Sequence, residues 1–98
     1  MANMYRIGRR AEKNLANQLR GRNYRNVRLS KGSRGPADVY GVKNGVKTYI
    51  QVKANTARET RGERTALRRL AKKRGGRAAI VYKRKSGTRW KLLGDFSR

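Results

Sequence analysis

The chain has 98 residues, with 28 Lys and Arg against 5 Asp and Glu, and its formal net charge is +23. Residues 1–98 are enough for one small domain, and a charge this far from zero indicates a polyanionic partner, nucleic acid before any other. The sequence has no Cys and no His, which excludes a disulfide framework, a zinc site and a histidine base. No apolar run approaches the roughly 20 residues that cross a bilayer, so we expect no membrane partner and a cytoplasmic protein.

The first segment predicts an amphipathic helix over about residues 4–19, because its apolar residues recur every three or four positions and Gly21 follows as a stop. Glu12 lies beside the apolar stripe of this helix. The periodicity alone leaves open whether Glu12 pairs with nearby arginines on a solvated face or reaches a functional site at the edge of a sheet.

A short strand is expected over residues 23–30, and a loop rich in glycine follows it over residues 31–36. Lys31 and Arg34 flank the backbone N–H groups of this loop. Such a loop is either a plain connection or a cradle for phosphate.

A β-hairpin is the strongest local prediction, because the pair Asn44-Gly45 tolerates positive φ and is flanked by Val, Tyr, Thr and Ile. A two-residue turn at these positions fixes the register of the two strands. It places Asp38 opposite Gln51, and alternation along the second strand puts Lys53 on the same face as Gln51.

A carboxylate, an amide oxygen and an ammonium group are therefore expected to converge at Asp38, Gln51 and Lys53. Oxygen ligands of this kind suit Mg²⁺, which acidifies bound water and shields charge on a phosphodiester, while a lysine positions the water. The alternative is a surface hairpin in which Asp38 and Lys53 form an exposed cross-strand pair.

A second helix is predicted to begin after Thr60 and to end at Gly75, because Thr60 and Glu63 have the spacing of a capping box and Gly75 suits a left-handed cap. Glu59 and Glu63 thus have a structural explanation and are not assigned to catalysis. The exposed face of this helix is either solvated or follows DNA phosphates; it carries Arg58, Arg61, Arg64, Arg68, Arg69 and Lys72.

The C-terminal part predicts two further strands. Residues 78–82 form a continuous apolar run, which is typical of a central strand buried on both faces. Residues 88–93 alternate basic side chains with Trp90 and Leu92, which predicts a strand with one buried face. The expected fold is an α/β domain of order αβββαββ, a mixed sheet flanked by helices.

Pro36-x-Asp38, followed after twelve residues by Gln51-x-Lys53, resembles the PD-(D/E)XK core of restriction-endonuclease-like nucleases. From about residue 4 to residue 93, the order and spacing of several segments are similar to those of the archaeal-type Holliday junction resolvases. The segments that carry this similarity are Met4-Tyr5-Arg6-x-Gly8-x-x-Ala11-Glu12, Val27-Arg28 leading into Gly32-Ser33, and Lys73-Arg74-Gly75-Gly76 before a hairpin that ends in Trp90.

The resemblance implies a structure-selective endonuclease that resolves four-way DNA junctions by paired nicking as a homodimer. It implies Mg²⁺ as cofactor, with Mn²⁺ as a substitute, and a cellular or viral gene product of a prokaryotic host. The implied catalytic residues are Glu12, Asp38, Gln51, Lys53 and Ser33, with Ser30 as the alternative serine; the implied metal ligands are Glu12, Asp38, Gln51 and the carbonyl of Val52; and the predicted DNA-binding residues are Arg6, Arg9, Arg10, Lys13, Arg28, Lys31, Arg34, Arg58 and Arg61.

Position 51 departs from the resembled pattern, in which glutamate is usual. Gln51 offers an oxygen but no charge, which predicts weaker metal binding. Two other functions compete with the nuclease. A small basic RNA-binding protein of the ribosomal type explains the size and charge, and a catalytically weakened, DNA-architectural relative of the nuclease explains Gln51.

Overall fold

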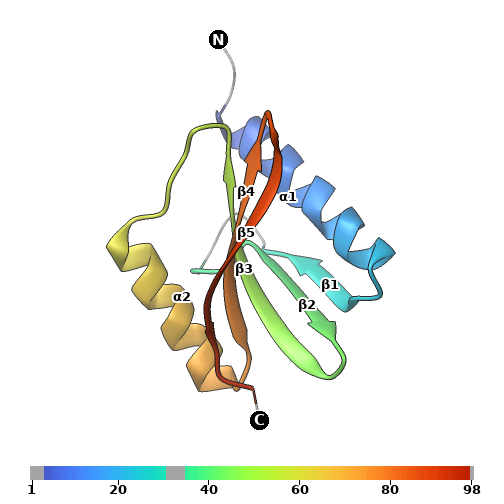
Figure 1. The fold of residues 1–98 in the computed structure, drawn as a ribbon, viewed down its shortest axis with the longest axis vertical. Helices are drawn as coiled ribbons and strands as arrows, with labels where there is room; N and C mark the ends of the chain where they lie inside the picture. The colour runs from blue at the N-terminus through green and yellow to red at the C-terminus, as the bar shows by residue number, and fades with distance from the viewer. Residues whose placement is uncertain (1–3, 31–34, 98) are drawn as a thin grey trace.

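The computed structural model describes residues 4–30 and 35–97, with side chains from Gly8 onward. Within these residues, two helices and five strands follow one another in the predicted order αβββαββ (Figure 1). The elements are α1 (Met4–Gly21), β1 (Arg25–Leu29), β2 (Val39–Lys43), β3 (Val46–Ala54), α2 (Arg61–Arg74), β4 (Arg77–Arg84) and β5 (Gly87–Asp95).

The five strands form one mixed sheet in the order β1-β2-β3-β4-β5, in which β3 and β4 are parallel and the other neighbours antiparallel. Helix α1 packs across β1, β2 and β3, and α2 packs across β3, β4 and β5 (Figure 1). Ile50 lies in the apolar cluster beneath α1 and Ile80 in the cluster beneath α2, so each helix covers its own face of the sheet. Within the described residues, no helix is long and apolar enough to cross a membrane.

The β2–β3 hairpin has the predicted register. Asn44 and Gly45 have φ values of 52° and 78°, as a tight turn of this type requires. Lys43 pairs with Val46, and the pairing continues to Val39 with Ile50. The regular pairing stops at Val39, the first residue of β2. Asp38 therefore lies immediately before the strand.

The predicted capping box of α2 is confirmed. The Thr60 hydroxyl accepts from the Glu63 N–H at 3.1 Å, and the Glu63 carboxylate accepts from the Thr60 N–H at 2.8 Å. Gly75 ends the helix with φ 70°. The next residue, Gly76, passes so close to β3 that an added Cβ would lie 2.5 Å from the Lys47 carbonyl oxygen. These local features fix where α2 crosses the sheet.

The predicted buried face of β5 is wrong. Trp90 and Leu92 are 37% and 61% exposed. Trp90 pairs with Val81, which belongs to the cluster beneath α1, so Trp90 continues that face of the sheet. The main contacts of helix α1 are with β1, β2 and β3, and none is with β5, so among the described residues no helix covers this face of β5.

Candidate active site

Asp38 is held at the point where β2 begins. Its N–H donates to the Ile50 carbonyl at 2.8 Å, and its carboxylate accepts from the Val52 N–H at 2.9 Å. The side chain thus accepts a β3 backbone donor just beyond the end of the β2–β3 ladder. Because the N–H and C=O of one residue point to the same side of an extended strand, the Val52 carbonyl faces this end of β2 as well.

Glu12 approaches from α1 and is only 7% exposed. Its carboxylate accepts from the Arg9 guanidinium at 3.2 Å, and Arg9 also donates to the Ser30 carbonyl at 3.0 Å. Glu12 thus forms the local ion pair with Arg9, but it is buried and does not lie on a solvated face; its role in a functional site stays a prediction. Burial raises the pKa of Glu12, the charge of Asp38 raises it further, and Arg9 acts in the opposite direction.

The pKa of Asp38 is also raised, first by burial. The Val52 N–H and the ammonium of Lys53 lower it, whereas the charge of Glu63 raises it, and the net shift is upward. Two carboxylates whose charge is costly in the fold thus lie close enough to interact. Carboxylates with pKa values shifted by burial and by a neighbouring charge are typical of functional sites.

Gln51 and Lys53 project from β3 toward the beginning of α2. The Gln51 amide nitrogen donates to a Glu63 carboxylate oxygen at 2.8 Å, and the Lys53 ammonium donates to the same oxygen at 2.9 Å. The other Glu63 oxygen accepts from the Thr60 N–H at 2.8 Å. One carboxylate therefore joins the helix cap to two predicted site residues.

The site residues fit a hard divalent cation. The Gln51 amide oxygen is buried and has no hydrogen-bond partner among the residues that the structure describes. Two carboxylates, this amide oxygen and a backbone carbonyl are all oxygen donors, the kind that Mg²⁺ and Mn²⁺ prefer. Within residues 4–30 and 35–97, no three acidic side chains gather to form a metal site on their own, so the neutral oxygens of Gln51 and Val52 matter.

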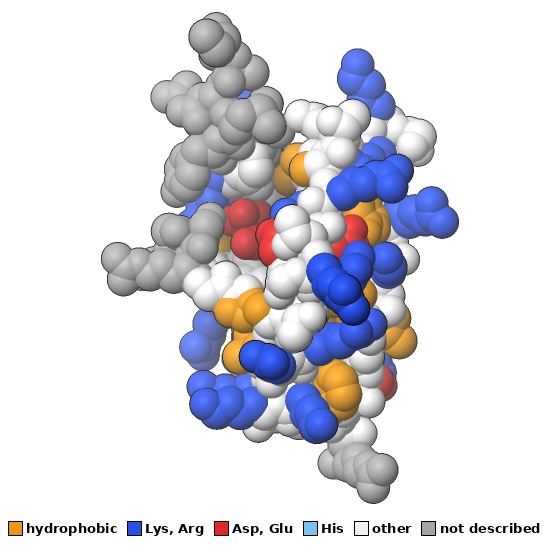
Figure 2. Space-filling model, turned by 90° about the vertical axis from the view of Figure 1, so that its left-hand side faces the viewer, with side chains coloured by type: hydrophobic (Ala, Val, Ile, Leu, Met, Phe, Trp, Pro, Cys, Tyr) orange, Lys and Arg blue, Asp and Glu red, His pale blue; other side chains and the backbone are white. Residues whose placement is uncertain are grey.

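The predicted DNA-binding residues fall into three groups. Arg10, Lys13, Arg28, Arg58 and Arg61 are exposed, whereas Arg9 is committed to the contacts given above. Arg28 and Asp38 line the same pocket of about 310 Å³. Viewed from the side of α2, most of the visible acidic side chains gather near the middle of the surface, with Lys and Arg around them (Figure 2). The predicted residues Lys31, Ser33 and Arg34 and the side chain of Arg6 lie outside the described parts of the chain.

The fold and the sequence agree on one family. A sequence model described as archaeal Holliday junction resolvase (Hjc) matches residues 3–97, nearly the whole chain. The chain belongs to this resolvase family. A solved structure of Hjc from Archaeoglobus fulgidus, a Holliday junction resolvase of an archaeal hyperthermophile, superposes with a TM-score of 0.77 and 19% identity, over 88% of this chain and 72% of that one. A search of curated proteins gives no match.

For this member of the resolvase family, the sequence did not predict the second role of Glu63. Its capping-box spacing accounts for one carboxylate oxygen, and that explanation is confirmed. The other oxygen contacts Gln51, 12 positions away in the sequence, and Lys53, 10 positions away. One signal for this contact was present in the sequence. The chain has only 5 acidic residues, and one of them, Glu63, follows the uncharged Gln51 by 12 positions.

Proposed function

We propose that this chain is an endonuclease that resolves four-way DNA junctions by metal-dependent paired nicking as a homodimer. Two observations support the chemistry: the carboxylates of Glu12 and Asp38 lie close enough to interact, and the buried Gln51 oxygen has no hydrogen-bond partner among the described residues. Family membership supports the substrate, branched DNA. The net charge of +23 supports a polyanionic partner of either nucleic-acid type, so the family decides between them.

Glu12, Asp38, the Gln51 oxygen and the Val52 carbonyl would hold the cation, Mg²⁺ or Mn²⁺. When bound, the cation supplies charge neutralisation at the scissile phosphate and makes water more acidic. Lys53 adds a positive charge in a fixed position, because its side chain is only 17% exposed and its ammonium donates to Glu63. We assign Lys53 to stabilising the charge that develops on the phosphate as the bond breaks. The role of Ser33 stays a prediction from the sequence, because this residue lies outside the described parts of the chain.

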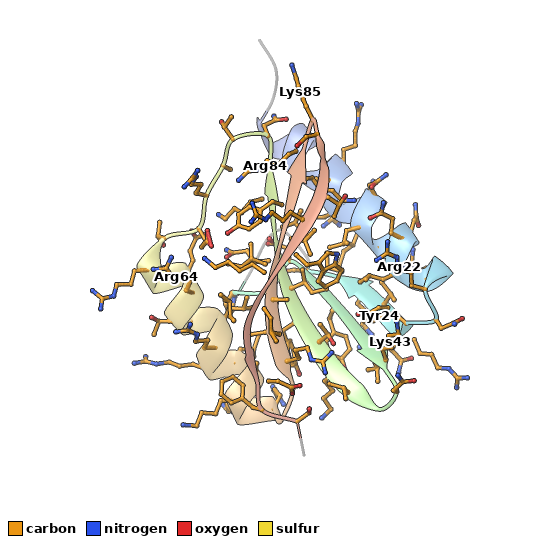
Figure 3. The ribbon with its side chains drawn as sticks, viewed as in Figure 1. Arg22, Tyr24, Lys43, Arg64, Arg84 and Lys85 are labelled. Atoms are coloured by element: carbon orange, nitrogen blue, oxygen red, sulfur yellow. The ribbon has the colours of Figure 1, made fainter. Side chains whose placement is uncertain are left out.

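A larger basic hollow, of about 770 Å³, lies between the start of α2 and the β4–β5 hairpin. It lacks Asp38 and the other proposed ligands, so we assign it to holding a DNA arm and not to the chemistry. Figure 3 shows Arg84 and Lys85 toward the hairpin turn and Arg64 on α2. Phosphate contacts of such residues set affinity and salt dependence without reading bases. The basic residues that line the hollow are Arg58, Arg64, Arg84, Arg89 and Lys91.

A dimer follows from the symmetry of the substrate. A four-way junction has near two-fold symmetry, so a two-fold dimer places one site on each of two opposed strands. Light scattering of the free protein should give twice the chain mass of 11.2 kDa. A chain that stays monomeric on junction DNA would contradict paired nicking.

The decisive experiment uses a supercoiled plasmid that extrudes a cruciform. Paired nicking within one complex converts the plasmid directly to linear DNA, whereas independent nicks accumulate an open circle first. We expect Mg²⁺- or Mn²⁺-dependent linear product, and no product from a plasmid without the cruciform. Tight junction binding with no cleavage at any metal concentration would favour the DNA-architectural alternative, for which Gln51 is the supporting observation.

A further inference from the structure

The contacts of Glu63 determine which way the Gln51 amide points. An ionised carboxylate only accepts hydrogen bonds, so the atom of Gln51 that lies 2.8 Å from it is the nitrogen. The Gln51 oxygen then lies on the opposite side of the amide group, and this is the buried oxygen without a partner among the described residues. Gln51 is only 7% exposed, so bulk water has little access to this oxygen. Glu63 therefore turns a neutral side chain into an oriented oxygen donor.

Glu63 is itself firmly placed. The Thr60 N–H holds one carboxylate oxygen, and Gln51 and Lys53 share the other. Its carboxylate contacts the amide nitrogen of Gln51, and its negative charge contributes to the raised pKa of Asp38. A carboxylate at position 51 would meet the carboxylate of Glu63 at hydrogen-bond distance without a proton between them.

We infer that Glu63 is a positioning residue of the cation site, which orients the oxygen of Gln51 toward the cation, holds Lys53, and supplies from α2 the negative charge that position 51 lacks. This inference rests on the proposed function, because it concerns the same site. It explains why Gln51 and Glu63 occur together in one chain. The two residues act as a unit, in which one provides the ligand atom and the other the charge.

Two substitutions separate this role from helix capping. In Glu63→Gln, the amide oxygen can keep the Thr60 bond, but the amide nitrogen then faces two donors, Gln51 and Lys53. Gln51 must rotate and turn its NH₂ group toward the cation. In Gln51→Glu combined with Glu63→Gln, the amide of residue 63 donates to the new carboxylate, and the other oxygen of residue 51 faces the cation. The same change at Glu63 should therefore weaken the site in one background and improve it in the other.

The experiment measures Mn²⁺ affinity by calorimetry on the intact protein without DNA, for the wild type, both single variants and the double variant. Glu63→Gln alone should weaken Mn²⁺ binding at least about tenfold, the usual cost of losing a partner that orients a ligand. The double variant should bind at least as tightly as the wild type and more tightly than Gln51→Glu alone. Thr60→Ala removes the capping hydroxyl but keeps the backbone N–H and the Glu63 carboxylate, so it should weaken binding far less than Glu63→Gln. Asp95→Asn, far from the site, should stay within about twofold of the wild type.

A second measurement follows the side-chain amide signal of Gln51 by nuclear magnetic resonance without metal, with the Gln51→Glu variant as its assignment. We expect this signal to move in Glu63→Gln and to stay in place in Asp95→Asn. Unchanged Mn²⁺ affinity in Glu63→Gln, or a loss of the same size in both backgrounds, would overturn the inference. A wild-type chain that binds Mn²⁺ but cleaves no junction would reject the proposed function and leave the role of Glu63 standing.

Discussion

Two partly buried carboxylates of this molecule, those of Asp38 and Glu59, show opposite electrostatic behaviour. Asp38 has a raised pKa, because burial outweighs its contacts with the Val52 N–H and Lys53. The side chain of Glu59 is only 5% exposed, yet its pKa is lowered. Burial disfavours the charge at both positions. The difference lies in the hydrogen bonds around Glu59, because the single O–H of Tyr82 donates to its carboxylate and lies 2.5 Å from both oxygens.

The difference shows where the fold leaves a charge uncompensated. Around Glu59, the Lys91 ammonium adds an attraction at 3.7 Å, and the cluster is complete without a ligand. Around Asp38, the attraction of Lys53 does not offset burial and the charge of Glu63, and the charge of Asp38 in turn raises the pKa of Glu12, so the positive charge present does not balance these carboxylates. A fold that tolerates such a cost at one place and avoids it at another supports the proposal that the first is the functional site.

The largest expected effect comes from Asp38→Asn. Junction cleavage should fall by about 10³-fold, because a metal supplies several kcal/mol of charge stabilisation that depends on its ligands. Junction binding should be kept or become tighter, since a negative charge near phosphate is removed. The measurement pairs a cleavage time course with a binding titration at the same salt concentration. Cleavage near the wild-type rate would show that Asp38 is not a ligand.

The same variant tests the sign of the pKa shift in a metal-free buffer with a chelator. The folded pKa of Asp38 lies above its unfolded value of about 3.9, so its charge costs stability at neutral pH and the cost is relieved as pH falls through the raised pKa. Asp38→Asn should therefore unfold at an equal or higher temperature than the wild type at pH 7. This advantage should shrink on acidification. A lower unfolding temperature at pH 7 would contradict the comparison.

Lys53→Met should have the next largest effect. It removes the ammonium that Glu63 holds and keeps most of the apolar stem. We expect a loss of about 10²-fold in the cleavage rate at saturating Mg²⁺, the usual cost of removing one group that stabilises charge in the transition state. The half-saturating Mg²⁺ concentration should change far less than the rate. An effect confined to that concentration would assign Lys53 to metal binding.

Features that depend on neighbouring residues in the sequence were predicted correctly, whereas features that depend on tertiary packing were not. The Asn44-Gly45 turn and the Thr60 cap depend on residues next to them, and both are confirmed. The contact of Glu63 with β3 depends on how α2 crosses the sheet, which tertiary packing decides. The exposure of Trp90 has the same cause, because alternation tells which residues share a face but not whether a helix covers that face.

Glu59→Gln should affect stability and leave the catalytic site intact. It keeps an acceptor for Tyr82 but loses the charge, at a cost of about 1–2 kcal/mol in the free energy of unfolding. Because the folded pKa of Glu59 is below its unfolded value of about 4.3, its contribution is complete above that pH and is lost as pH falls through the folded pKa. Unfolding curves from pH 7 down to pH 3 should show the variant and the wild type converging. A constant difference over this range would reject the assignment.

The smallest effect is expected at Asp95, although its pKa is lowered to about 2. The hydroxyl and N–H of Ser97 hold this carboxylate, with Arg77 at 3.0 Å, but the group is exposed to solvent. Exposed pairs contribute little, because water and salt screen them and both side chains lose freedom. Asp95→Asn should thus lower the unfolding temperature less than Glu59→Gln at pH 7, and the small loss should fade at raised salt. The contribution of Asp95 has the same sign as that of Glu59, present above the unfolded pKa of about 3.9 and lost toward the folded value. If Asp95→Asn destabilises the chain as much as Glu59→Gln, burial is not what gives a satisfied carboxylate its weight, and the comparison between Asp38 and Glu59 loses its physical basis.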